Sequence, residues 1–134
     1  MAPLAPIDMA QSRYVNDVLG LNPLGYWRLD GNANDATANG NSGVLVNGVT
    51  FAGAGGGASI GDPSNQAALF TSVRDQYINM PGTASGSLFA LDWNHPVTMM
   101  IWVKTADTAA GSIPLAKEEN SGNYRGPYLI NDNG

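Results

Sequence analysis

The sequence predicts an all-β fold, an antiparallel β-sandwich preceded by a short N-terminal helix. Short apolar runs alternate with turn clusters about every ten residues, which yields about eight strands. Charged residues make up only 13% of the chain, and 17 glycines and 8 prolines supply residues typical of turns. Residues 97–104 (VTMMIWVK) form the strongest predicted strand. Both of its alternating sets contain large apolar side chains, which predicts a central strand covered on both faces.

The first 20 residues are expected to be an arm and a helix, followed by one sandwich domain over residues 21–134. Residues 1–7 are mostly small residues and prolines. A helix is predicted over residues 9–19, with Asp8 as the N-cap and Gly20 at the C′ position. Its apolar face would contain Tyr14, Val15, Val18 and Leu19.

The remaining strands are expected at residues 25–29, 44–51, 67–71, 76–80, 112–117 and 128–131. Of these, 67–71 and 76–80 are expected to form a hairpin around Ser72–Asp75. Asn47-Gly48 is a turn signal inside or beside the 44–51 strand. Residues 128–131 read as the first arm of a hairpin without a second arm. The C-terminal strands are therefore expected to be missing, either because the polypeptide is longer or because a neighbouring copy supplies them.

Composition argues against several classes of function. The net charge is −5 and the six Lys and Arg residues are scattered, so nucleic-acid binding is not expected. The absence of cysteine excludes disulfides and thiolate metal sites. No segment predicts membrane insertion or a signal peptide. A phage protein released by lysis needs no signal, so the expected location is a virion or an extracellular or cell surface.

Four motifs, in order, carry a resemblance to a known family: VNDVLGLNPLGYWRLDG, DATANGNSGVLVNGVTF, AALFTSVRDQYINMP and VTMMIWVKT. Together they resemble the laminin-G-like, concanavalin A-like lectin domains of bacterial surface proteins and phage tail proteins. The resemblance covers about residues 14–131 and implies a jelly-roll sandwich. The sequence departs from the family pattern at Ala38, where serine is usual, and at Thr71, where glycine is usual.

The loop of residues 30–43 is a candidate calcium site. It concentrates Asp and Asn side chains, whose oxygens Ca²⁺ prefers. The resemblance implies a structural calcium, with Asp35 and Asn41 at the matching positions. The alternative is turn chemistry without metal, because Asn, Asp and Gly tolerate left-handed backbone and form Asx-turns.

Trp93 and Asn94 are the candidate glycan-binding residues. They lie in the predicted loop LDWNHP, where an exposed indole could stack on a sugar and an amide could hydrogen-bond to it. A structural role for Trp93 is the alternative. Trp27 and Trp102 lie within predicted strands and are expected in the core.

An enzyme is not expected. His95, the only histidine, precedes Pro96 and has no nucleophile elbow to act with. Glu118 and Glu119 are adjacent, so on a strand they would point to opposite faces and could not flank one glycosidic bond. The isolated cations, among them Arg28 and Lys104, are expected to be solvated ends.

The expected function is therefore a non-enzymatic glycan-binding, adhesion or structural module of a phage virion (tail, fibre or decoration) or of a bacterial surface protein. Its partners would be glycans or neighbouring subunits, in a homo-oligomer or a larger assembly. Two alternatives stay open. One is an assembly or decoration protein without a sugar ligand, and the other is the non-catalytic part of a carbohydrate-active enzyme.

Overall fold

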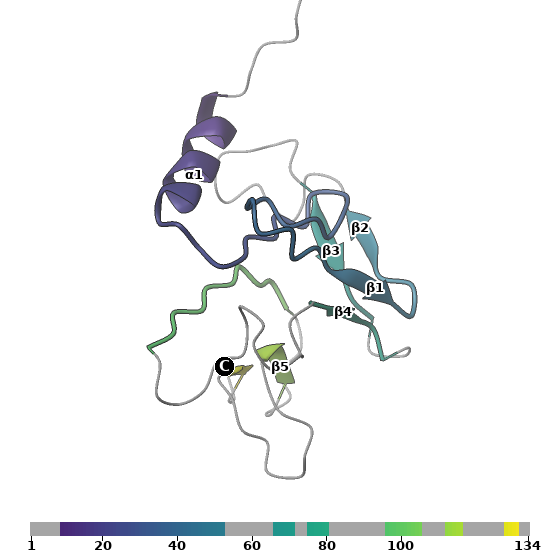
Figure 1. Ribbon diagram of the computed structural model, residues 1–134. Helices are drawn as coiled ribbons and strands as arrows, with labels where there is room; N and C mark the ends of the chain where they lie inside the picture. The colour runs from purple at the N-terminus through teal and green to yellow at the C-terminus, as the bar shows by residue number, and fades with distance from the viewer. Residues whose placement is uncertain are drawn as a thin grey trace, which may run out of the picture. The chain divides into compact units, whose positions relative to one another are not determined.

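The computed structural model describes residues 9–52, 66–71, 75–80, 96–105, 112–116 and 128–131. These contain one helix and six strands, and every strand pair is antiparallel (Figure 1). Among the regular elements of these described residues, strands outnumber helices six to one, which is consistent with an all-β fold. The chain divides into two units, Met1–Pro81 and Gly82–Gly134, which are taken in turn.

Helix α1, Met9–Gly20, confirms the predicted helix and its apolar face. Val18 is buried, its neighbours on that face are half-buried, and Asn16 and Asp17 are exposed. At the C-terminal end, the Leu21 and Asn22 N–H groups donate to the carbonyls of the last turn. Asn22 has a φ of 52°, so it takes the left-handed position that the sequence assigns to Gly20. The predicted N-cap, Asp8, lies outside the described residues.

The expected strand at residues 25–29 is wrong. The only pairing there is an isolated antiparallel bridge between Trp27 and Asp35. Leu29 and Gly31 have φ values of 56° and 72°, which turn the backbone out of the extended conformation. The segment therefore becomes one side of a closed loop instead of a strand.

A two-arm antiparallel ribbon, made of two successive two-stranded sheets, follows this loop in the first unit. Strands β1 (Val44–Val46) and β2 (Thr50–Ala52) form one arm, and β3 (Ala67–Leu69) and β4 (Tyr77–Asn79) form the other. The inner pair is β2–β3 and the outer pair is β1–β4 (Figure 1).

The predicted hairpin of residues 67–71 with 76–80 is consequently wrong. Both segments do contain strands, but β3 and β4 pair with the preceding arm instead of with each other. Asn47 and Gly48, with φ values of 58° and 77°, split that arm in two. The first half, β1, then pairs with β4, and the second half, β2, pairs with β3.

The split leaves an interruption in the ribbon. Val46 pairs with Tyr77 and Thr50 with Leu69, so three residues of one arm face seven of the other. Gln76 bridges this gap with its side-chain amide. Its Nε2 donates to the carbonyls of Asn47 (3.0 Å) and Gly48 (2.8 Å), and its Oε1 accepts from the Thr71 N–H (2.6 Å). The side chain thus replaces ladder bonds that the backbone cannot make.

The second unit contains one described strand pair, β5 (Ser112–Ala116) with β6 (Tyr128–Asn131). Residues 128–131 are therefore a second arm, and the prediction that they begin an unpaired hairpin is wrong. The register shifts between Ser112 and Leu115. Pro114 lies in this interval, and because proline lacks an N–H it interrupts a regular ladder.

Residues 97–104 do not form the predicted central strand. In the described part of the chain, residues 96–105 belong to no helix or strand. Met100 is 62% exposed and Trp102 is 66% exposed, so the expected core position of Trp102 is also wrong. A strand buried on both faces needs a ladder partner and a covering layer, and the described residues place neither of these at this segment.

Gly43 marks the closest packing between the loop and the ribbon. A Cβ built on Gly43 would lie 2.7 Å from Ile78 Cγ2 on β4 and 3.0 Å from Met80 Sδ. The loop backbone therefore contacts β4 side chains directly, which only glycine permits.

Replacing Gly43 with alanine should destabilise the first unit by about 1–3 kcal/mol, because the added methyl group overpacks this contact. Gly20→Ala is the matched control. Nothing lies within 4 Å of a Cβ at that position, so the change should be neutral or slightly stabilising. Urea denaturation of both variants measures the difference. Equal free energies of unfolding for Gly43→Ala and the unchanged protein would contradict the contact.

Candidate functional site

The loop of residues 30–43, here called the Asp35 loop, is built around one carboxylate. Asp35 Oδ1 accepts hydrogen bonds from the N–H groups of Tyr26 (3.0 Å) and Thr37 (2.9 Å). Asp35 Oδ2 accepts from Thr37 Oγ1 (2.8 Å) and from the Asn41 N–H (2.9 Å). A carboxylate has about four acceptor positions, so these donors fill it.

These hydrogen bonds close the loop on itself. The donors are spread over residues 26–41, so one side chain connects the segment before the loop, at Tyr26, with the end of the loop, at Asn41. Backbone bonds continue the closure, from the Ala36 N–H to the Tyr26 carbonyl and from the Gly43 N–H to the Ala33 carbonyl, both at 2.7 Å. Ala33, a residue of the loop, is buried. The loop therefore has a defined shape although it contains no regular ladder.

The same contacts set the charge state of Asp35. Partial burial raises the pKa of its carboxyl group. The hydrogen bonds from Tyr26, Thr37 and Asn41 stabilise the ionised form and outweigh this effect, so the pKa of Asp35 lies below the usual aspartate value. The loop is therefore held by an anionic centre at neutral pH.

A second cluster of hydrogen bonds surrounds the Leu24 carbonyl and Asn41. The side-chain Nδ2 atoms of Asn39 and Asn41 both donate to the Leu24 carbonyl, each at 3.1 Å. The indole Nε1 of Trp27 donates to the Asn41 carbonyl at 2.7 Å. Trp27 is half-buried, and its indole N–H holds the end of the loop at Asn41.

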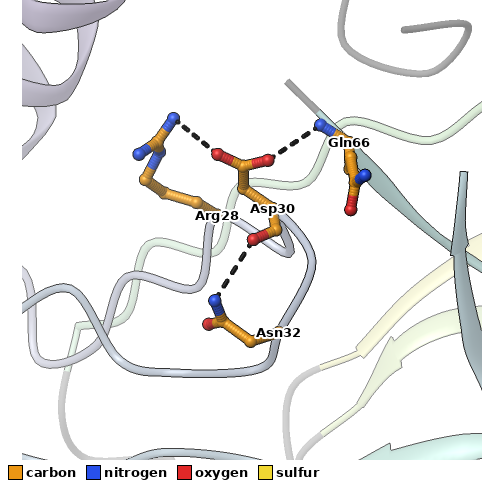
Figure 2. Close-up of polar contacts among 4 residues, drawn as sticks. All are labelled: Arg28, Asp30, Asn32 and Gln66. Carbon is orange, nitrogen blue, oxygen red and sulfur yellow. Dashed lines mark hydrogen bonds and ion pairs between the residues drawn. The ribbon is translucent and has the colours of Figure 1, made fainter. Parts of the chain in front are cut away.

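Asp30 joins the loop to the ribbon (Figure 2). Its Oδ2 forms an ion pair with Arg28 Nη2 at 3.3 Å, and its Oδ1 accepts from the Gln66 N–H at 3.0 Å. Asn32 Nδ2 donates back to the Asp30 carbonyl at 3.2 Å. Arg28 is thus engaged with Asp30, contrary to the expectation that it is a solvated end. The contact to Gln66 spans 36 residues and connects the loop with the start of β3.

The two predicted calcium ligands, Asp35 and Asn41, lie in contact, but the Asn41 side chain does not point its amide N–H toward Asp35. Asn41 approaches Asp35 through its backbone N–H, and its side-chain Nδ2 is turned to Leu24. A cation at Asp35 would have to displace at least one of four donors. The described residues contain no group of three or more His, Cys, Asp or Glu side chains able to hold a metal ion. The acceptor positions of Asp35 are thus occupied by protein donors, and the calcium site that the family resemblance implies is not tested by the structure.

Other candidates from the sequence are not tested. Trp93 and Asn94, together with His95 and the Glu118-Glu119 pair, lie outside the described residues. The sequence reasoning missed Thr37, which supplies two of the four donors to Asp35. The spacing Asp35-Ala36-Thr37 is an Asx-turn signal that could have indicated it. Gln66 and Gln76 were also missed, and no local signal marks a glutamine for a long-range contact.

Comparison with known proteins gives no relative to guide the assignment. No protein-family model, no curated protein and no solved structure matches the chain. Among the residues that the structure describes, no helix has the length and apolar character needed to cross a membrane.

Replacing Asp35 with asparagine should destabilise the first unit by roughly 1.5–3 kcal/mol at neutral pH, because an amide group cannot accept from all four donors. The pH dependence should change as well. Since the folded-state pKa is lowered, the contribution of Asp35 is complete above the unfolded aspartate pKa and is lost as the pH falls through the folded value.

Urea denaturation between pH 3 and about pH 6, across the unfolded aspartate range, measures this contribution. The difference in unfolding free energy between the unchanged protein and Asp35→Asn should shrink as the solution is acidified. Asp17→Asn, the same change at an exposed position on α1, is the control. A difference that does not vary with pH would contradict the role of the ionised carboxylate.

Millimolar calcium should leave the melting temperature unchanged, because the Asp35 oxygens already have four donors. Thermal melts in calcium and in a chelator, with magnesium as the control ion, test this expectation. A calcium-specific rise in melting temperature that Asp35→Asn abolishes would instead establish the metal site that the family resemblance implies.

Proposed function

We propose that this chain is a non-enzymatic recognition module of a virion or a bacterial surface, with a laminin-G-like jelly-roll sandwich as its scaffold and glycans as its ligands. The observation that carries the proposal is the closure of the Asp35 loop by one four-donor carboxylate. Such a loop holds its shape before binding, which lowers the entropic cost of contacting a ligand.

The exposed residues of the Asp35 loop are uncharged: they are asparagines, one serine, alanines and glycines. Asn32, Asn34, Asn39 and Ser42 are exposed there, and the charged groups of Asp30 and Arg28 are engaged with one another. Amide and hydroxyl groups match the hydrogen-bonding pattern of sugar hydroxyls. The proposed ligand is therefore a neutral glycan, bound shallowly and strengthened by several copies acting together. Trp93 and Asn94 are the proposed stacking and hydrogen-bonding partners.

A second candidate is an assembly or decoration role without a sugar ligand. The ribbon favours it, because several of its large apolar side chains are exposed: Val44, Leu45, Leu69, Phe70 and Tyr77. An isolated two-stranded ribbon is marginally stable, and apolar side chains of this kind are often covered by another subunit.

A glycan array combined with light scattering separates the two candidates. Glycan recognition predicts binding to one class of neutral glycans, with a loss of about tenfold or more for Trp93→Ala if the indole stacks on the sugar. Asp35→Asn should weaken the same binding by loosening the loop. Asp17→Asn, an exposed change on α1, is the control and should bind normally.

No glycan binding together with a concentration-dependent oligomer would select the assembly role and reject glycan recognition. Binding that survives both Trp93→Ala and Asp35→Asn would place the ligand elsewhere and contradict the proposed site. Binding lost equally in the Asp17→Asn control would mean that the readout reports folding instead of recognition, and would also count against the site.

A further inference from the structure

Two exposed Asn-Gly pairs of the first unit, Asn39-Gly40 and Asn47-Gly48, have the same local chemistry but different surroundings. In each pair the glycine has a φ above 70° and the asparagine is exposed. An Asn-Gly pair can rearrange without an enzyme. The glycine nitrogen attacks the asparagine Cγ, ammonia leaves, and water opens the resulting succinimide to aspartate or isoaspartate. Attack requires the connecting peptide to rotate, and it is easiest where no Cβ obstructs the nitrogen.

The peptide between Asn47 and Gly48 is held in place. Gln76 Nε2 donates to both carbonyls, at 3.0 Å and 2.8 Å. The Asn47 side-chain Nδ2 donates to the Asp75 carbonyl at 3.0 Å. Rotating this peptide toward the attack geometry would break the Gln76 bond to the Asn47 carbonyl, and the bond to the Gly48 carbonyl holds the following peptide, so the ribbon opposes the reaction.

The peptide between Asn39 and Gly40 lacks such a clamp within the described residues. The hydrogen bonds of Asn39 use its backbone N–H, to Thr37 Oγ1, and its side-chain Nδ2, to the Leu24 carbonyl. Its carbonyl and Gly40 take part in none of the hydrogen bonds described for this loop. Nothing lies within 4 Å of a Cβ built on Gly40, so the surroundings of the attacking nitrogen are open.

We propose that Asn39 is a site of spontaneous succinimide formation and deamidation, and that Gln76 protects Asn47 from the same reaction. The product at Asn39 carries a carboxylate where an amide donated to the Leu24 carbonyl, so two oxygens then face each other. Isoaspartate also adds a methylene group to the loop backbone. Asn41 continues to donate to Leu24, so the change loosens the Asp35 loop without removing its Asp35 centre.

Ageing the purified full chain at mildly alkaline pH tests the proposal. Peptide mass spectrometry follows the mass increase and the released ammonia at each site, and treatment with an isoaspartyl methyltransferase identifies isoaspartate. Asn39 should convert roughly tenfold faster than Asn47, since the Gln76 hydrogen bond to the Asn47 carbonyl opposes rotation of the second peptide and the bond to the Gly48 carbonyl holds the next one. In the urea-unfolded chain the two rates should be similar.

Gln76→Ala should raise the rate at Asn47 toward that at Asn39 and leave the rate at Asn39 unchanged. Gln76→Glu, which retains the acceptor for Thr71 but lacks the amide donor, should act in the same direction. Asn39→Gln should abolish the early product, because the longer side chain forms the ring poorly. Equal rates in the folded chain, or faster conversion of Asn47, would overturn the proposal. Acceleration of both sites alike by Gln76→Ala and by Gln76→Glu would overturn the protective role of Gln76.

Discussion

The first unit depends on one set of partly buried hydrogen bonds, those between the Asp35 carboxylate and its four donors. Residues 22–43 contain no regular strand or helix, so their backbone groups need other partners. Asp35 supplies the acceptors for three N–H groups and one hydroxyl group. Hydrogen bonds to an ionised group are stronger than neutral ones, which lets a single side chain organise a long loop. Because the Asp35 bonds fix the loop backbone, they also fix where its exposed asparagines lie.

Local features of the sequence predict local features of the structure well. The helix, its apolar face and the turn at Asn47-Gly48 follow from spacing and residue type within a few positions. Asp35 and Asn41, which the resemblance assigns to calcium, lie in contact through the Asn41 backbone N–H. This contact does not test the predicted metal site. Residue type alone does not distinguish an asparagine that binds a cation from one that satisfies a carbonyl.

Long-range features could not be predicted in the same way. The partners of β3 and β4 depend on a split in an arm about 20 residues earlier, and on the ability of Gln76 to span the resulting gap. The hydrophobic pattern of 67–71 and 76–80 is equally compatible with a local hairpin. Residues 97–104 show a related difficulty. Their pattern predicts burial on both faces, but burial depends on covering layers that a single segment does not encode.

The exposed apolar residues of the ribbon and the closed polar loop are separate parts of the first unit. A polar loop with a preset shape suits contact with hydroxyl-rich ligands, whereas exposed side chains such as Phe70 and Tyr77 on the ribbon suit contact with other protein surfaces. The glycan and assembly roles are therefore physically compatible, since each would use a separate part of the first unit. What connects them is the Asp30–Gln66 contact, because it joins the loop directly to the start of β3. Any subunit that packed on the ribbon near β3 would act on the same strand that holds the loop in place.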